Sequence, residues 1–428
     1  MKPPTAGCRT LLALALLLLP VLASAATTRV RSGQSITRAI AQAWPGDVIE
    51  IERGHYRENL VVDKPLTLRG IGKPTVDGGG HGDVIRVTAT DVTVDNLIVR
   101  DSGSDLGAQN AGVYLQPGAD RAQVRHCDFA HVLFGLWIEK ANDVRIEDNL
   151  ITGMREMLSS QRGNGIQLYN TQGARIARNH ISFTRDGIYV DVSHHAEFVG
   201  NRIHHVRYGS HYMNSYHNLW QDNESFRNVG GLALMEVRDI TVRANRTWAN
   251  ADHGIMLRTL QDSTIENNVA AGNARGFFIY DVEYSALRGN LIVGNRIGVH
   301  LWAGSYRNDV DGNDFILNGE QVRYVASRDV EWGKRTGNYW SNYLGWDQDG
   351  NGRGDTPYEA SDVGDRLVSR YPFVKLLDSS PALQTLKLIS RQFPILRVPT
   401  ITDAAPAMQP HHPDWQRWLS PPESGAAP

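Results

Sequence analysis

Cysteine is almost absent from this chain, which has two such residues in 428. Cys8 lies before the apolar run of residues 11–19, so it cannot be the acceptor cysteine of a lipoprotein, which would follow that run. Cys127 is then the only cysteine of the mature chain, and no intramolecular disulfide can form. The sequence therefore predicts a fold that is stabilised by packing alone.

An excess of charge of one sign and a second long apolar run are also missing. The 44 basic residues nearly balance the 46 acidic ones, so the chain has no bulk field for nucleic acid or anionic lipid. Lys2 and Arg9, the apolar run and the small residues at 23–25 form a secretory signal, and the run is too short to span a bilayer. We expect residues 1–25 to be removed and the mature chain to lie in a bacterial periplasm, without a nucleic-acid partner.

Glycine is plentiful, and it marks a repeat. A segment of the form glycine-apolar-x-apolar-x recurs in steps of 23, 30, 22, 22, 22, 23, 22 and 22 residues. Its nine glycines are Gly112, Gly135, Gly165, Gly187, Gly209, Gly231, Gly254, Gly276 and Gly298. A second marker, apolar-x-x-Asn, keeps the same period at Asn149, Asn179, Asn201, Asn223, Asn245, Asn268, Asn290 and Asn313, with Cys127 in the equivalent place one coil earlier. Two markers in register indicate stacked structural units.

The alternation within each unit predicts a short strand with one apolar face. The first and third residues after the glycine face inward, and stacking coils about 4.8 Å apart buries them in a continuous core. The asparagines belong at tight bends, where their amides can bond one another from coil to coil. We therefore expect an all-β, right-handed parallel β-helix of about 22-residue coils.

Both ends of this β-helix are expected to be capped. Residues 35–44 read as a short amphipathic helix with Ser35 as its N-cap, suited to cover the first coil. The β-helix domain is predicted to run over residues 26–375. A Pro-rich C-terminal tail, residues 376–428, includes a predicted helix at 382–392 and is expected to dock on another surface.

Two insertions interrupt the repeat just before the glycine strand. They comprise residues 101–111 and 153–164, and they double the usual spacing from the asparagine to the next glycine. Because both enter at the same point of the coil, we expect them to wall the same edge of the β-helix. In repeat proteins such insertions commonly mark the binding face.

Outward positions of the repeat carry a candidate site for a soft metal. His211, Met213, Met235 and Met256 lie on three successive coils, with Met213 directly beside Met235. Thioether and imidazole ligands favour Cu(I), which we expect to bind transiently. Two further methionines, Met154 and Met157, lie in the second insertion and are candidates to fold over this face. The alternative is an apolar patch covered by the tail or by a partner protein.

Aromatic side chains on the same outer face leave a carbohydrate function open. Trp137, Tyr169, Tyr189, Phe278, Tyr280 and Trp302 could stack on sugar rings. Hydrolysis would require a cluster of carboxylates, and only Glu139 and Asp191 appear, on coils that are not adjacent. No catalytic residues are therefore assigned, and we expect the chain not to be an enzyme. The doublets His194-His195 and His204-His205 are expected at turns and solvent-facing positions.

A second metal signal lies near the end of the repeat. Asp347, Asp349, Asn351 and Asp355 alternate with glycines in the manner of a Ca²⁺ loop. The twelfth position is Tyr358, and the acid Glu359 comes one residue late, so the segment departs from an EF-hand. A structural Ca²⁺ clip and a plain Asx-rich turn both remain open.

Several segments together resemble the NosD family over almost the whole mature chain. Coils of this kind also occur in many carbohydrate-active β-helices, so the coils alone are weakly specific. The closing motif and the Met/His face narrow the resemblance to this family. The segments are residues 77–85, 162–165, 337–343 and 356–358, with Pro406 and Pro410 in the tail.

The resemblance implies a non-enzymatic role in denitrification. NosD-like proteins sit on a membrane ABC transporter, composed of a permease and an ATPase. With a lipoprotein copper chaperone, they help to assemble the copper-sulfide cluster of nitrous oxide reductase. Membrane association would then occur through the permease alone, and the tail, from Ala382 to about Met408, would contact it.

Overall fold

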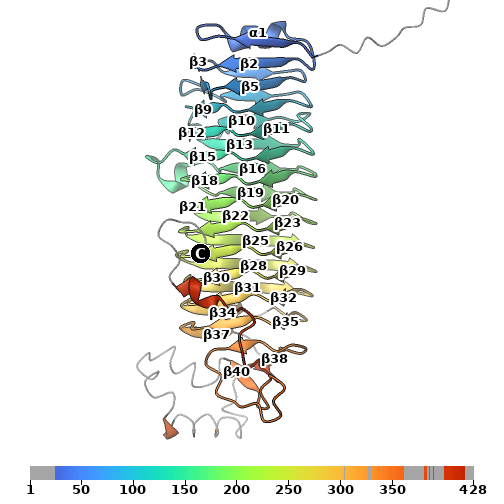
Figure 1. The fold of residues 1–428 in the computed structure, drawn as a ribbon, viewed down its shortest axis with the longest axis vertical. Helices are drawn as coiled ribbons and strands as arrows, with labels where there is room; N and C mark the ends of the chain where they lie inside the picture. The colour runs from blue at the N-terminus through green and yellow to red at the C-terminus, as the bar shows by residue number, and fades with distance from the viewer. Residues whose placement is uncertain are drawn as a thin grey trace, which may run out of the picture.

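The computed structural model describes residues 25–302, 304–325, 329–360, 380–382, 385, 389 and 400–419. It is a stack of rungs that extends from the helix α1 at one end to a small terminal sheet at the other (Figure 1). Each coil contributes one short strand to each of three long sheets, and neighbouring strands within these sheets pair in parallel. The parallel β-solenoid expected from the glycine and asparagine spacing is confirmed.

Sheet A has 13 strands. They are β1 (Thr27–Val30), β2 (Val48–Glu52), β5 (Thr67–Ile71), β8 (Thr93–Asp95), β11 (Gln123–Arg125), β14 (Arg145–Glu147), β17 (Arg175–Ala177), β20 (Glu197–Val199), β23 (Leu219–Gln221), β26 (Thr241–Arg243), β29 (Thr264–Glu266), β32 (Ala286–Arg288) and β35 (Asp309–Asp311).

Sheet B also has 13 strands and follows sheet A along each coil. They are β3 (His55–Arg57), β6 (Thr75–Asp77), β9 (Ile98–Arg100), β12 (Asp128–Val132), β15 (Leu150–Gly153), β18 (His180–Ser182), β21 (Arg202–His204), β24 (Glu224–Phe226), β27 (Arg246–Trp248), β30 (Val269–Ala271), β33 (Leu291–Val293), β36 (Asp314–Ile316) and β39 (Tyr339–Trp340).

Sheet C has 12 strands and contains the glycine-led segments. They are β4 (Leu60–Val62), β7 (Ile85–Val87), β10 (Ala111–Leu115), β13 (Phe134–Glu139), β16 (Ile166–Tyr169), β19 (Ile188–Asp191), β22 (Tyr208–Met213), β25 (Gly230–Arg238), β28 (His253–Gln261), β31 (Arg275–Glu283), β34 (Ile297–Trp302) and β37 (Glu320–Val325).

The core forms where the inward side chains of consecutive coils meet. Leu136 pairs with Ile166 across adjacent strands of sheet C, and both are fully buried. The period-two alternation therefore assigns the interior correctly. The coil around β22 departs from an aliphatic core, because Tyr212 is buried inside and packs against Phe198 and Trp220.

Each coil turns at a buried asparagine. The side chain of Asn223 donates to the side-chain oxygen of Asn245 at 3.0 Å and to the backbone carbonyl of Phe198 at 2.8 Å. This ladder of amides runs without a break from Asn149 to Asn338; the spacing predicted it as far as Asn313, and the structure adds one further step. A second ladder escaped the sequence reasoning. It consists of Asn228, Asn250, Asn273, Asn295 and Asn318.

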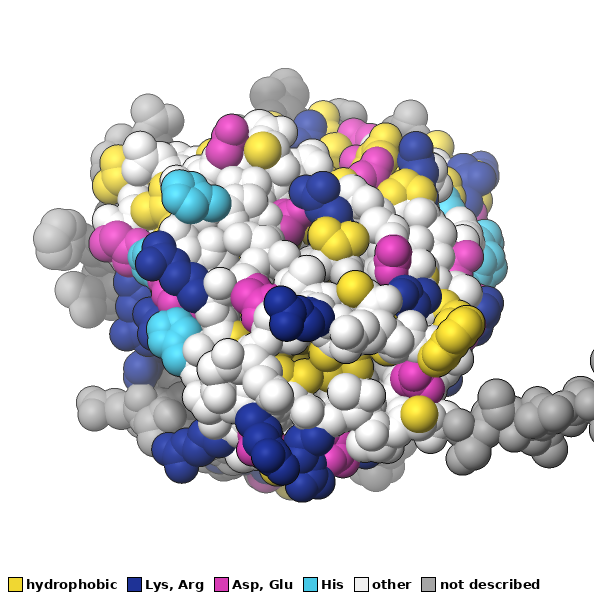
Figure 2. All heavy atoms as spheres, turned by 90° about the horizontal axis from the view of Figure 1, so that it is seen from above, with side chains coloured by type: hydrophobic (Ala, Val, Ile, Leu, Met, Phe, Trp, Pro, Cys, Tyr) yellow, Lys and Arg dark blue, Asp and Glu magenta, His cyan; other side chains and the backbone are white. Residues whose placement is uncertain are grey.

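The N-terminal cap has the form that the sequence predicted, in a shorter helix. Helix α1 (Ile36–Gln42) begins at Ser35, whose hydroxyl accepts from the N–H of Arg38 at 3.2 Å, as an N-cap does. Ile36 and Ile40 are buried against the first coil. Viewed along the long axis from the α1 end, basic, acidic and apolar side chains are interspersed (Figure 2).

The opposite end is closed by the tail. Strands β38 (Val330–Trp332), β40 (Tyr358–Ala360) and β41 (Ile401–Asp403) form the small terminal sheet. After β41 in the sequence, the chain turns back toward the earlier coils. The 3-10 helix η4 (Trp415–Leu419) lies against β33 of sheet B (Figure 1). Its residue Trp418 is buried in a cluster with Trp248 and Phe226.

Some predictions fall on other parts of the chain. The signal segment 1–24, the boundary near 375 and most of the tail helix at 382–392 lie outside the described residues. The domain limits therefore stay predictions. Within the part of the chain that the structure describes, no helix has the length and apolarity needed to cross a membrane.

Candidate metal-binding face

The predicted metal ligands project from the outer face of sheet C, in the middle of the stack. His211 lies on β22, with Tyr189 beside it on the preceding coil and Ala233 beside it on the following one. The rings of His211 and Tyr189 meet edge to face, with their centroids 4.7 Å apart. The imidazole is therefore held between two rungs and is only partly exposed.

A buried carboxylate fixes the orientation of this imidazole. Asp186 accepts a hydrogen bond from Nδ1 of His211 at 2.9 Å. The guanidinium of Arg207 donates two hydrogen bonds to the same carboxylate, at 2.8 and 2.6 Å. The side chain of Asp186 is 1% exposed. Burial alone would raise the pKa of Asp186, but hydrogen bonds from Arg207 and His211 and their positive charges lower it. The site therefore contains a charged, fully hydrogen-bonded carboxylate.

This contact decides which nitrogen of His211 is available to a ligand. A metal-binding histidine commonly donates its other ring N–H to a carboxylate, which fixes the tautomer and the direction of the ring. In the neutral form of His211, an Nδ1–H that donates to Asp186 places the lone pair on Nε2, which makes no hydrogen bond to any described residue. His211 is thus oriented in the way a metal ligand requires.

One of the three methionines lies on the same rung as this histidine, one on the next rung and one on the rung after that. Met213 lies two residues after His211 on β22, and the register of β22 with β25 brings it beside Met235. Met256 is paired with Ala233, the outward residue that separates it from His211. Ala233 is fully buried although it points outward, because the larger neighbouring side chains close over it. The four predicted ligands therefore occupy one continuous patch, and all are partly exposed.

The loop methionines lie elsewhere. Met154 is buried at 4% exposure in a small cluster with Tyr114 and Phe134, and Met157 packs against that cluster together with Trp137. Trp137 precedes His211 by three rungs of sheet C. The structure therefore does not bring these two methionines to the His211 patch.

Both insertions line one edge of the solenoid, as expected. Each connects sheet B to sheet C, and His131 bridges them, with Nδ1 at 2.7 Å from Asp101 and Nε2 at 2.8 Å from Glu156. Ser102 accepts from the N–H of Leu133 at 2.9 Å. This edge is a packed and hydrogen-bonded wall.

The aspartate loop is satisfied by its own backbone. Asp347 accepts N–H groups from Gly350 at 2.8 Å, Asn351 at 3.1 Å and Gly352 at 2.7 Å, and that of Gly352 is the leading cause of the lowered pKa of Asp347. Asp355 accepts from the N–H of Gln348 at 2.6 Å. Asn351 donates its side-chain amide to Asp349 at 2.8 Å. This geometry favours the Asx-rich turn over the Ca²⁺ clip.

No set of three or more His, Cys, Asp or Glu side chains converges on a metal position in the described ranges. The candidate site contains one imidazole and several thioethers, and methionine is not one of these four residue types.

The two predicted histidine doublets make different contacts. His195 stacks on His217, whereas His204 and His205 contact each other through their ring nitrogens.

The two outward carboxylates predicted from the sequence, Glu139 and Asp191, lie on rungs separated by that of Tyr169. Glu139 accepts a short hydrogen bond from the phenol of Tyr114, and the side chains beside it on this and the next rung are aromatic or amide groups.

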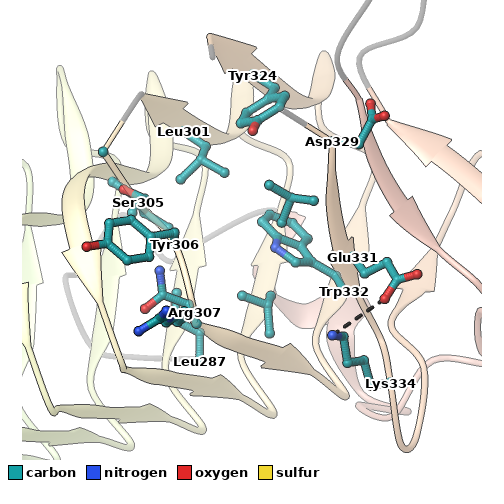
Figure 3. A pocket seen from close by; sticks show the side chains of 15 residues that line it. Leu287, Leu301, Ser305, Tyr306, Arg307, Tyr324, Asp329, Glu331, Trp332 and Lys334 are labelled. Atoms are coloured by element: carbon teal, nitrogen blue, oxygen red, sulfur yellow. Dashed lines mark ion pairs between the residues drawn. The ribbon is translucent and has the colours of Figure 1, made fainter. Parts of the chain in front are cut away.

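A cavity of about 700 Å³ lies where the last coils meet the terminal sheet (Figure 3). Leu301 and Trp332 line it, and Glu331 and Lys334 form an ion pair at 3.5 Å on its rim. None of the predicted site residues lines this cavity.

Sequence reasoning missed Asp186 and Arg207. The period-two rule was applied only from the glycine onward, and Asp186 directly precedes Gly187. The sequence does contain a signal for this contact. Asp186 is an acid directly before a repeat glycine, and it lies one coil ahead of the outward residue His211.

Comparison with solved structures supports the class of fold. The A-module of the mannuronan C-5 epimerase AlgE6 from Azotobacter vinelandii matches 71% of this chain and 92% of its own length, with a TM-score of 0.54 and 15% identity. At this identity, the likeness shows the fold alone. By fold, then, the chain is a parallel β-solenoid.

Its family follows from sequence. A family model described as "Periplasmic copper-binding protein (NosD)" matches residues 148–345. The "Probable ABC transporter binding protein NosD" of Pseudomonas aeruginosa is 36% identical over 83% of this chain and 87% of its own length, and that of Stutzerimonas stutzeri is 36% identical over 88% and 90%. This chain belongs to the NosD family.

Proposed function

We propose that this chain is a periplasmic, non-enzymatic accessory protein that handles copper during the maturation of nitrous oxide reductase. Membership of a family described as periplasmic and copper-binding supports this role. The observation that carries it is the imidazole of His211, held by Asp186 at 2.9 Å, with Met213 on the same rung and Met235 on the next.

In this proposal, copper is cargo. His211 would supply one nitrogen through Nε2, and Met213 and Met235 would supply thioether sulfur, a donor set that suits Cu(I) and excludes hard cations. Met256 would complete the patch from the far side of Ala233. Because these side chains are partly exposed, a chaperone could reach the ion on this face.

The partners follow from the family. The relatives are named as ABC transporter binding proteins, which supports docking on a permease whose ATPase works from the opposite side of the membrane. A lipoprotein copper chaperone would deliver the ion, and nitrous oxide reductase would receive it. We assign permease contact to the tail from Ala382 to about Met408, of which Ile401–Asp403 also closes the solenoid.

Cu(I) titration against a competing chelator, under anaerobic conditions, tests the copper site. We expect Met213→Ala and Met235→Ala each to weaken binding about tenfold or more, because each removes one of few ligands. Met408→Ala is the matched control, since this methionine lies in the tail. Unchanged affinity in both site variants would remove the proposed site, and an equal loss in Met408→Ala would show that the binding is unspecific.

A carbohydrate-binding role is the second candidate. Two exposed aromatic pairs favour it: Tyr280 with Trp302, and Tyr284 with Tyr306, each with ring centroids 6.3 Å apart. Such rings can stack on pyranose faces. A glycan array decides the question, because a role in sugar binding requires hits that disappear in Trp302→Ala.

A further inference from the structure

Three histidines meet on sheet B, one corner away from the His211 patch. His180 begins β18, His204 ends β21 on the next coil, and His205 follows it. Nε2 of His180 lies 2.6 Å from Nε2 of His204, and Nδ1 of His204 lies 2.7 Å from Nδ1 of His205. Sequence reasoning had placed the His204-His205 doublet at a solvent-facing turn, without a connection to His180.

The two Nε2 atoms are aimed at the same point. The ring centroids of His180 and His204 are 4.8 Å apart with planes at 65°, so the rings meet end to end. The pair His195 and His217 has nearly the same centroid distance, 5.0 Å, but its planes lie at 12° and the rings stack face to face. Only the first pair directs lone pairs toward a shared position.

The surroundings hold the central ring in place. His205 bonds the second nitrogen of His204, which is the role that an outer partner plays beside a metal ligand. Phe183 stacks on His205 with planes at 19°, and Phe226 lies against His204 with centroids 5.1 Å apart. His180 and His204 are half-buried, so both rings remain partly accessible to solvent.

Nearby arginines limit the charge that such a site can accept. The guanidinium of Arg155 lies over the ring of Phe183 at 4.0 Å. Arg202 lies over Phe226 and pairs with Glu224 at 3.5 Å. Arg227 adds a further positive charge beside His204. A monovalent ion is therefore favoured over a divalent one.

We propose that His180 and His204 form a second copper site, in which Cu(I) is held between the two Nε2 atoms. Two neutral imidazoles placed end to end suit an ion with two opposed ligands, and imidazole is a good ligand for copper. Metal–imidazole bonds of about 2 Å would place the nitrogens about 4 Å apart, so the rings must separate by about 1.4 Å. The proton now shared between the Nε2 atoms returns, by way of solvent, to an Nδ1 of the same pair, so that both imidazoles stay neutral and each Nε2 offers a lone pair.

This site and the His211 patch are built by the same two coils. The first coil contributes His180 and Asp186, and the second contributes His204 and His211. The choice of copper rests on the proposed function, whereas the existence of a two-nitrogen site rests on the ring geometry. Two weakly ligated positions around one corner would allow the ion to pass from one face of the solenoid to the other.

The experiment measures Cu(I) stoichiometry and affinity of the full-length mature protein by competition with a colorimetric chelator. We expect wild type to bind two ions, His180→Ala and His204→Ala to bind one, and the double variant of Met213 and Met235 to retain the histidine site. His205→Ala should weaken that site about tenfold, as loss of an outer partner does. X-ray absorption of the methionine variant should report nitrogen ligands only.

His195→Ala is the matched control, because it removes a histidine from the stacked pair, and it should bind as wild type does. Circular dichroism of each variant checks that the solenoid is intact. Unchanged stoichiometry and affinity in His180→Ala and His204→Ala would overturn the proposal and leave the three rings as a hydrogen-bonded chain. A wild type that binds a single ion, which His180→Ala and His204→Ala abolish and the substitutions of Met213 and Met235 leave unchanged, would refute the proposed function at His211 while sparing this site.

Discussion

Replacing Asp403 by alanine should open the end of the asparagine ladder. The carboxylate oxygen Oδ2 of Asp403 accepts three hydrogen bonds: from the backbone N–H of Asn338 at 2.8 Å, from its side-chain amide at 2.9 Å and from Nε1 of Trp340 at 3.1 Å. Asp403 is fully buried, and burial raises its pKa although these donors act against it. The tail thus supplies the last acceptor of a ladder that begins far from it in sequence.

The magnitude follows from the donors left without a partner. A buried unsatisfied donor costs about 1–3 kcal/mol, so three of them would cost about 3–9 kcal/mol. Water can reach part of an opened terminal coil, so we expect a loss of about 3–5 kcal/mol in Asp403→Ala. Asp403→Asn keeps one oxygen acceptor but buries an amide N–H₂ in place of Oδ1, which has no hydrogen-bond partner among the described residues, so we expect a smaller loss of about 1–3 kcal/mol.

Urea unfolding followed by tryptophan fluorescence measures this effect, because Trp340 reports on the affected coil. Solenoids are coupled mainly between neighbouring coils, so amide exchange of the terminal coils should be read beside the global transition. Asp349→Ala, in the exposed loop, is the control and should change stability by less than about 0.5 kcal/mol. If Asp403→Ala stays within about 1 kcal/mol of wild type, the ladder does not depend on this acceptor.

Three further predictions concern the aspartate loop, the tail and one histidine. Ca²⁺ or a chelator should leave the melting temperature unchanged, because three backbone N–H groups already satisfy Asp347; a rise of several degrees with Ca²⁺ would restore the clip. Trp418→Ala should destabilise the docking of the tail on sheet B by about 3 kcal/mol and expose the tail to limited proteolysis, whereas protection equal to wild type would contradict its anchoring role. Burial and two nearby arginines lower the pKa of His300 to about 4, and its Nε2 accepts from Trp302 at 2.7 Å. Its folded pKa therefore lies below the unfolded value, and its contribution to stability falls as pH drops from about 6.5 toward 4. His300→Phe should flatten the melting-temperature profile in that window, and an unchanged slope would reject this cause.

The fold could be predicted because two chemically unrelated markers carried the same period. Buried glycines and asparagines each have few substitutes at their positions: a Cβ at Gly209 would lie 2.7 Å from the carbonyl oxygen of Gly231, and the amide of Asn245 accepts from Asn223 and donates to Asn268. The second ladder, which includes Asn250, has the same period but begins only at Asn228, so fewer of its members repeat along the sequence. The closure by Asp403 could not be foreseen, because nothing in the sequence says where a tail returns.

The candidate site was only half predictable, and the reason is geometric. A period of 22 or 23 residues identifies residues directly opposite on neighbouring rungs, such as His211 and Ala233. The contacts that orient outer side chains are diagonal: Asp186 to His211 and Tyr114 to Glu139 span 25 residues, and His180 to His204 spans 24.

Long side chains lean along the strand, so the atoms that meet belong to residues two or three positions out of register. Counting in steps of one coil therefore finds columns such as Met213 and Met235 and misses the partners that hold a histidine ring in place. Searching outward positions of a solenoid at one coil plus two or three residues would have found Asp186 for His211, and His180 for His204, from the sequence alone.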